Sequence, residues 1–142
     1  MTVNDNIRRP VPVTLLAWGV LILTMFNVVR FSTALAQWDL ILSFMKRPGP
    51  IYIALTGLIW GLGWLIAFLG LWFGSRWART VTLSIAILYS TYYWIDRLIY
   101  QSEGARKNLS FSLSLTIFFL ISTAVILLLP GSRKYFQTER EQ

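Results

Sequence analysis

The sequence contains no cysteine and no histidine among its 142 residues. These two absences exclude disulfide bonds, thiol nucleophiles and imidazole acid–base chemistry. They also exclude the zinc and haem sites that depend on Cys or His ligands. We therefore expect no metal site, no cofactor and no catalytic centre, and hence a protein that is not an enzyme.

Charged residues are also scarce. Asp, Glu, Lys and Arg make up 13% of the chain, whereas hydrophobic residues make up 56%. Soluble domains carry about 25% charged residues, so this balance points away from a soluble protein. Basic residues outnumber acidic residues by 13 to 6, and they lie mainly at the ends of apolar runs. This distribution predicts contact with the anionic head groups of a lipid bilayer and not with nucleic acid.

The chain has four long apolar runs instead. Each contains about 20 residues, enough for a helix to cross a hydrocarbon core about 30 Å thick. The pattern predicts an all-α membrane protein with four transmembrane helices in an antiparallel up-and-down bundle. It forms a single domain over residues 1–142, with spans at residues 13–36, 51–73, 77–100 and 109–129 and a charged tail over residues 132–142.

The first run allows a second interpretation. A basic start, an apolar stretch and the sequence Ala34-Leu35-Ala36 resemble a secretory signal peptide with its cleavage site. The run is longer than such peptides usually are and contains Arg30, which favours a retained helix. The segment that follows, residues 37–50, has apolar residues at helical spacing. It predicts a short interfacial helix, or an extension of the first helix, ended by prolines.

The second run is free of charge and rich in glycine. Two pairs have the GxxxG spacing that lets membrane helices approach closely. They predict helix-packing contacts either within the chain or with a second copy, and the spacing alone favours contacts within the chain. The helix-packing glycines are Gly57, Gly61, Gly63, Gly70 and Gly74.

The short turn Gly74-Ser75-Arg76 predicts an antiparallel hairpin of the second and third spans. With the residues that follow, GSRWAR resembles turns of small prokaryotic membrane proteins, which implies a prokaryotic cytoplasmic membrane and no particular activity. Lys and Arg are slightly more numerous on the side of this turn and of both termini, so both termini are expected to be cytoplasmic. That side carries Arg8, Arg9, Arg76, Arg79, Arg133, Lys134 and Arg140, and the other carries Lys46, Arg47, Arg97, Arg106 and Lys107.

Two ionisable residues lie inside the runs. A charge at mid-membrane costs about 2.5–3.5 kcal/mol on insertion scales, so each requires a partner or a role. Arg30 and Asp96 have a similar helical rise from the same membrane surface, which predicts a direct contact between them. A polar aromatic pocket between the first and third spans follows, with the candidate ligand-binding residues Asn27, Arg30, Tyr89, Tyr92, Tyr93 and Asp96. Alternatively, Arg30 extends to the interface and the tyrosines belong to an aromatic belt.

Two functional hypotheses follow. The first is a non-enzymatic structural or accessory subunit that packs in the bilayer, as a homo-oligomer or within a larger membrane complex. The alternative is a small transporter, channel or binder of a lipophilic or anionic ligand that uses the polar aromatic pocket. The small multidrug-resistance transporters have a similar span count, but they depend on a glutamate in the first span. The first run here carries Asn27 and Arg30 and no carboxylate.

Overall fold

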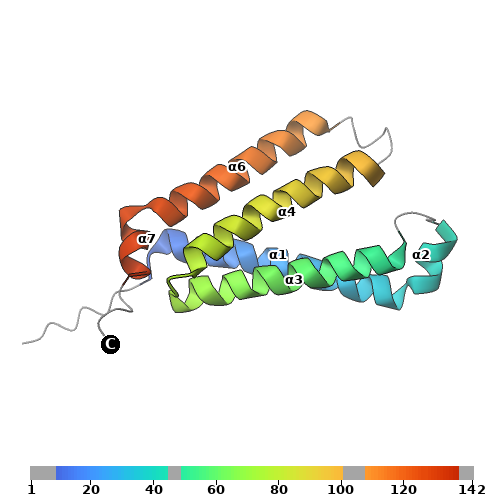
Figure 1. Ribbon diagram of the computed structural model, residues 1–142, viewed down its shortest axis with the longest axis horizontal. Coiled ribbons are helices and arrows are strands. Elements are labelled where there is room, and N and C mark those ends of the chain that lie inside the picture. Colours follow the sequence, from blue (N-terminus) through green and yellow to red (C-terminus); the bar gives the residue numbers. More distant parts are fainter. Residues whose placement is uncertain (1–8, 45–48, 101–107, 138–142) are drawn as a thin grey trace, which may run out of the picture.

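The structure, a computed structural model, describes residues 9–44, 49–100 and 108–137. All regular structure in these residues is helical, and the four apolar runs each form one helix. Two shorter helices accompany them. The helices are α1 (Val11–Ala36), α2 (Trp38–Phe44), α3 (Pro50–Phe73), α4 (Ala78–Tyr100), α6 (Leu109–Leu128) and α7 (Pro130–Tyr135), as Figure 1 shows.

Three of these helices, α1, α3 and α6, are long and apolar enough to cross a membrane. The sequence predicted four such helices, and α4 is the one that does not reach the required hydropathy. Serines, threonines and tyrosines along α4, together with Asp96 and Arg97 near its end, lower its mean hydropathy. The chain is therefore an all-helical protein with three helices suited to crossing a bilayer.

Local sequence explains where the helices begin and end. Proline occupies the first turn of α1, α3 and α7, where a missing N–H group costs nothing. Gly74 ends α3 in the left-handed conformation with φ of 74°, which glycine adopts without strain. The N–H of Ser75 then donates to the carbonyl of Gly70 at 3.0 Å. The chain reverses within four residues, and α4 runs antiparallel to α3 (Figure 1).

The long helices form two pairs, α1 with α3 and α4 with α6 (Figure 1). The α1–α3 pair is the more closely packed, because Gly57 brings the two backbones together. A Cβ atom added at Gly57 would lie 2.9 Å from the backbone nitrogen of Phe31 and 3.1 Å from the carbonyl oxygen of Asn27. The buried core lies around this pair, and includes Val13, Ala17, Val20, Trp64, Ala67, Leu71, Ala86 and Leu127.

The end of the molecule that carries α7 and the turn after α3 is called the α7 end, and the opposite end, with α2, the α2 end (Figure 1). At the α7 end, two hydrogen bonds and a cation–π contact join Arg9, Trp72 and Tyr135. Nη2 of Arg9 donates to the Trp72 carbonyl at 2.7 Å, and its guanidinium lies 3.9 Å from the Trp72 ring centroid. The Tyr135 hydroxyl donates to the same carbonyl at 3.1 Å.

The sequence interpretation took the segment after Pro130 as a tail and missed α7. The sequence features that indicate this helix are few: proline at the first helical position, and Arg133 and Lys134 in the last turn. Phe136, just beyond the helix, is buried in the core. Because the Tyr135 hydroxyl of α7 bonds to the Trp72 carbonyl of α3, α7 also holds the end of α6 next to the end of α3.

Candidate functional site

The charges inside the helices are held by tyrosine hydroxyls. Nη2 of Arg30, on α1, donates to the hydroxyl of Tyr92, on α4, at 3.0 Å. The hydroxyl of Tyr52, on α3, donates to Oδ1 of Asp96, on α4, at 2.8 Å. Both bonds lie within one turn of α4, because Tyr92 and Asp96 are four residues apart. Together they form a polar bridge from the α4 face to both helices of the α1–α3 pair.

The predicted direct contact between Arg30 and Asp96 is not formed among the described residues. Arg30 and Asp96 nevertheless lie at a similar level, as their helical rise indicated, because Arg30 bonds to Tyr92 and Tyr92 lies four residues before Asp96 on α4. Tyr92 occupies the position that faces Arg30, and Tyr52 supplies the hydrogen bond to the carboxylate. Sequence reasoning missed Tyr52, since a tyrosine near the start of an apolar run resembles an interfacial anchor.

Asn27 and Tyr89 lie deeper in the interior. Asn27 is fully buried, and its Nδ2 donates to the Leu23 carbonyl of its own helix at 2.8 Å. Its Oδ1 is buried without a hydrogen-bond partner in the described structure. The Tyr89 ring packs edge-on against two tryptophans of α3, Trp60 at 5.2 Å and Trp64 at 5.5 Å between centroids. These two tryptophans of α3 are therefore further residues of the site.

Tyr93, the remaining candidate, is held by its own helix. Nη1 of Arg97 donates to the Tyr93 hydroxyl at 2.7 Å, and the guanidinium carbon lies 5.9 Å from the ring centroid. Tyr89 and Tyr92 have ring centroids 6.2 Å apart, so the buried pair Asn27 and Tyr89 adjoins the polar bridge. Tyr93 bonds to Arg97 of its own helix instead.

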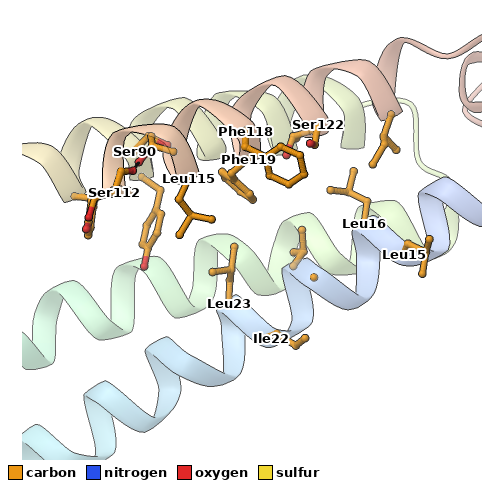
Figure 2. Close-up of a pocket in the computed structure, with 17 residues that line it drawn as sticks. Leu15, Leu16, Ile22, Leu23, Ser90, Ser112, Leu115, Phe118, Phe119 and Ser122 are labelled. Atoms are coloured by element: carbon orange, nitrogen blue, oxygen red, sulfur yellow. Dashed lines mark hydrogen bonds between the residues drawn. The ribbon is translucent and has the colours of Figure 1, made fainter. Parts of the chain in front are cut away.

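A cavity of about 680 Å³ lies instead between α1, α4 and α6. Leucine, isoleucine and phenylalanine supply eight of its seventeen lining residues, and α4 contributes Tyr89, Ser90 and Tyr93. Figure 2 shows Leu16 and Leu23 of α1 pointing toward α6, with Leu115 of α6 pointing back across the gap. Neither Asn27, Arg30 nor Asp96 lines this cavity.

The cavity has a physical cause in the unequal packing of the helices. Gly57 draws α1 against α3, whereas the side of α1 that faces α6 carries a glycine, Gly19. A Cβ atom added at Gly19 would meet nothing within 4 Å. The space left between α1 and the α4–α6 pair is therefore not filled by side chains.

Hydroxyl groups on the cavity wall add little polarity. The hydroxyl of Ser90 donates to the Ala86 carbonyl at 2.8 Å, and that of Thr116 donates to the Ser112 carbonyl at 2.9 Å. Both hydrogens are thus used within their own helices, as is common in membrane helices. An occupant of this cavity would meet an apolar wall.

The five predicted packing glycines all lie against other parts of the same chain. Gly57 and Gly61 face α1, and Gly63 faces the side chain of Ile85 on α4. At Gly70, an added Cβ atom would lie 2.7 Å from the Trp77 ring, and at Gly74 it would lie 2.9 Å from the Tyr135 ring. Contacts within the chain therefore occupy the notches that a homodimer would otherwise use.

Comparison of the chain with protein families, curated proteins and solved structures finds no match. The class of protein is therefore given by the fold alone: an all-helical chain with three helices suited to crossing a bilayer.

Proposed function

We propose that the protein is an integral membrane protein in which α4 forms a fourth crossing. The direction of the chain supports this proposal, since α3 and α6 both end at the α7 end (Figure 1). Nε of Arg79, at the start of α4, donates to the Leu127 carbonyl near the end of α6 at 3.1 Å. If α3 and α6 cross in the same direction, the chain between them must return. Among the described residues, α4 is the helix available to do so.

For orientation we propose that both termini are cytoplasmic, in a prokaryotic cytoplasmic membrane, with α2 at the opposite interface. The support is the slight excess of Lys and Arg at the α7 end, where they would meet anionic head groups. Several of the residues in this count lie outside the described residues: Arg8, Lys46, Arg47, Arg106, Lys107 and Arg140.

We further propose that the protein binds a lipophilic molecule in the cavity between α1, α4 and α6. The observation that carries this proposal is a cavity of about 680 Å³ with an apolar wall. Ligand pockets in proteins usually measure about 300–1,000 Å³. Within a bilayer, binding gains little from the hydrophobic effect, so the affinity comes from packing and shape. The proposed binding site is therefore this apolar cavity, and not the polar aromatic pocket between α1 and α4 that the sequence predicted.

The second candidate function is a structural or accessory subunit, alone, as a homo-oligomer or in a larger complex. It is supported by α6, the least buried of the three most apolar helices. Large exposed apolar side chains outside the cavity include Phe111 and Ile121. These side chains would form the contact with a partner helix.

Native mass spectrometry of the protein extracted in mild detergent tests both candidates. We expect the wild type to retain a lipophilic molecule, and Gly19→Leu to lose it, because Gly19 lines the cavity and an added Cβ atom there meets nothing within 4 Å, so the new side chain would occupy the cavity. Gly131→Leu is the matched control, since its Cβ atom also meets nothing within 4 Å and lies outside the cavity. Equal retention in the wild type and in Gly19→Leu would refute the binder. A bare monomer with no companion subunit would refute the homo-oligomer and the larger complex, and with them the accessory role.

A further inference from the structure

The cavity between α1, α4 and α6 opens sideways, between α1 and α6. Three of its lining residues are largely exposed and are called the rim: Leu15 and Ile22 of α1, at 65% and 67%, and Phe118 of α6, at 70%. Other lining residues of the same two helices are buried, among them Val20 and Thr123. If these helices cross a bilayer, the opening at the rim faces the hydrocarbon chains of the lipid and not water.

The cavity stops short of both ends of α6. Its wall on α6 begins at Ser112, three residues after the start of the helix at Leu109. It ends at Ile126, two residues before the last residue of the helix, Leu128. At 1.5 Å per residue this wall is about 21 Å long, whereas the hydrocarbon core of a bilayer is about 30 Å thick. An elongated occupant of this length would therefore lie wholly within the hydrocarbon core, short of the head groups on either side.

The wall offers no counter-ion to an occupant at that depth. Among the described residues that line it, none is charged, and the polar ones are serines, threonines and tyrosines. The hydroxyls of Ser90 and Thr116 donate within their own helices. Arg97 donates to the hydroxyl of Tyr93 but does not itself line the cavity. Because a charged group inside a bilayer is costly without a partner, this wall disfavours an ionised occupant.

We infer that the occupant is an uncharged, elongated hydrocarbon molecule that lies within the hydrocarbon core and enters sideways from the bilayer between α1 and α6. The inference rests on the proposed binding of a lipophilic molecule and adds the ligand class and its route. A phospholipid does not fit this description, because its head group stays at the membrane surface whereas the cavity begins inside the core. A free neutral lipid, such as a fatty alcohol or an alkane, has no group that must stay at the surface.

The first test titrates four probes into the delipidated protein in mild detergent and measures binding by native mass spectrometry. Hexadecanol, hexadecyl sulfate and hexadecyltrimethylammonium have the same chain and differ in the charge of the head group. Dipalmitoyl phosphatidylcholine is the fourth probe and represents a membrane phospholipid. We expect hexadecanol to bind at least about tenfold more tightly than either ion, because only the ions bring a charge into the core. At equal concentration the phosphatidylcholine should not displace hexadecanol.

The possible outcomes separate this inference from the proposed function. Binding of either ion as tightly as hexadecanol, or displacement of hexadecanol by the phosphatidylcholine, overturns the inference and leaves a lipophilic binder standing. Failure of all four probes to bind, or equal binding of hexadecanol by the wild type and Gly19→Leu, removes the binder itself. Gly131→Leu is again the matched control and should bind hexadecanol as the wild type does.

The route is tested separately, because the chain has no native cysteine to compete for a linker. In the double variant Ile22→Cys, Phe118→Cys, a bismaleimide with an internal disulfide joins the two sides of the rim. We expect exchange of bound hexadecanol for deuterated hexadecanol to slow about tenfold, as when a lid controls release. Reduction of the linker should restore the rate, since it reopens the rim and leaves both half-linkers in place. Equal exchange rates before and after reduction would overturn the sideways route.

Discussion

At the scale of single residues, the charged groups inside the long helices are hydrogen-bonded to tyrosine hydroxyls. A tyrosine packs its ring among apolar neighbours and still presents a hydroxyl to a charged group. Tyr92 does this for Arg30 and stacks on Trp60 at 5.3 Å, and Tyr52 does it for Asp96. Each charge is thus satisfied across a helix interface without an ion pair between Arg30 and Asp96.

A double-mutant cycle should detect this arrangement. We expect Tyr52→Phe and Asp96→Asn to be coupled by about 0.6 kcal/mol, and at most about 1.7 kcal/mol, the range found for hydrogen bonds between membrane helices. Arg30→Gln and Asp96→Asn should be nearly additive, because these residues have separate partners. Unfolding in mixed detergent micelles measures both cycles. A larger coupling for Arg30 with Asp96 than for Tyr52 with Asp96 would contradict the assignment.

The sequence predicted the level of these charged residues along their helices, but not their hydrogen-bond partners. Helical rise alone predicted that Arg30 of α1 and Asp96 of α4 lie at the same level of the bundle, since rise is fixed by residue number. Their partners depend on how each helix is rotated about its axis and which neighbours it has. Nothing in the sequence near Tyr52 fixes either property, so the hydrogen bond to Asp96 could not be predicted.

At the scale of helices, the decisive feature is the close approach of α1 and α3 at Gly57. The glycine spacing predicted that a close contact would occur, but not which helix would make it. The structure assigns the contact to α1, whose backbone at Phe31 leaves no room for a side chain at position 57. The cavity is the counterpart of this contact, because α1 cannot pack equally closely against α3 and α6. Its existence depends on distances between helices and was not predictable from spacing.

Gly57→Ala should therefore destabilise the protein by about 1–3 kcal/mol, the usual cost of overpacking a well-packed contact. Gly63→Ala is the matched control on the same helix, since its added Cβ atom has its nearest neighbour at 3.9 Å. We expect its effect to stay within about 0.5 kcal/mol. Thermal or detergent-induced unfolding compares the two variants. Similar losses for both would show that Gly57 is not a special contact.

At the scale of the whole molecule, the common direction of α3 and α6 supports the proposed topology of four crossings. With four crossings, residues 43 and 137 lie on opposite sides of the membrane. With three crossings and α4 outside the hydrocarbon, they lie on the same side. Helix boundaries were well predicted because prolines and Gly74 mark them locally, but the count of crossings depends on the path of the chain.

Single cysteines decide between these topologies. Ser43→Cys, Asn108→Cys and Gln137→Cys all replace exposed residues of a chain without other thiols. In intact cells, a membrane-impermeant maleimide should label positions 43 and 108 and reach position 137 only after permeabilisation. Labelling of 43 and 137 from the same side would rule out the fourth crossing. Labelling of 137 alone would reverse the proposed orientation.

The weak hydropathy of α4 has a consequence for biosynthesis. If α4 is a crossing, it leaves the ribosome after α1 and α3 and carries Asp96 and Arg97, which disfavour its partition into lipid. The nascent α1–α3 pair already presents Tyr52 and Arg30, the groups that receive Asp96 and Tyr92. Integration of α4 by the translocon would then depend on this earlier pair as a template. Insertion of α4 would therefore have to follow insertion of the α1–α3 pair, which is also the order in which these helices are synthesised.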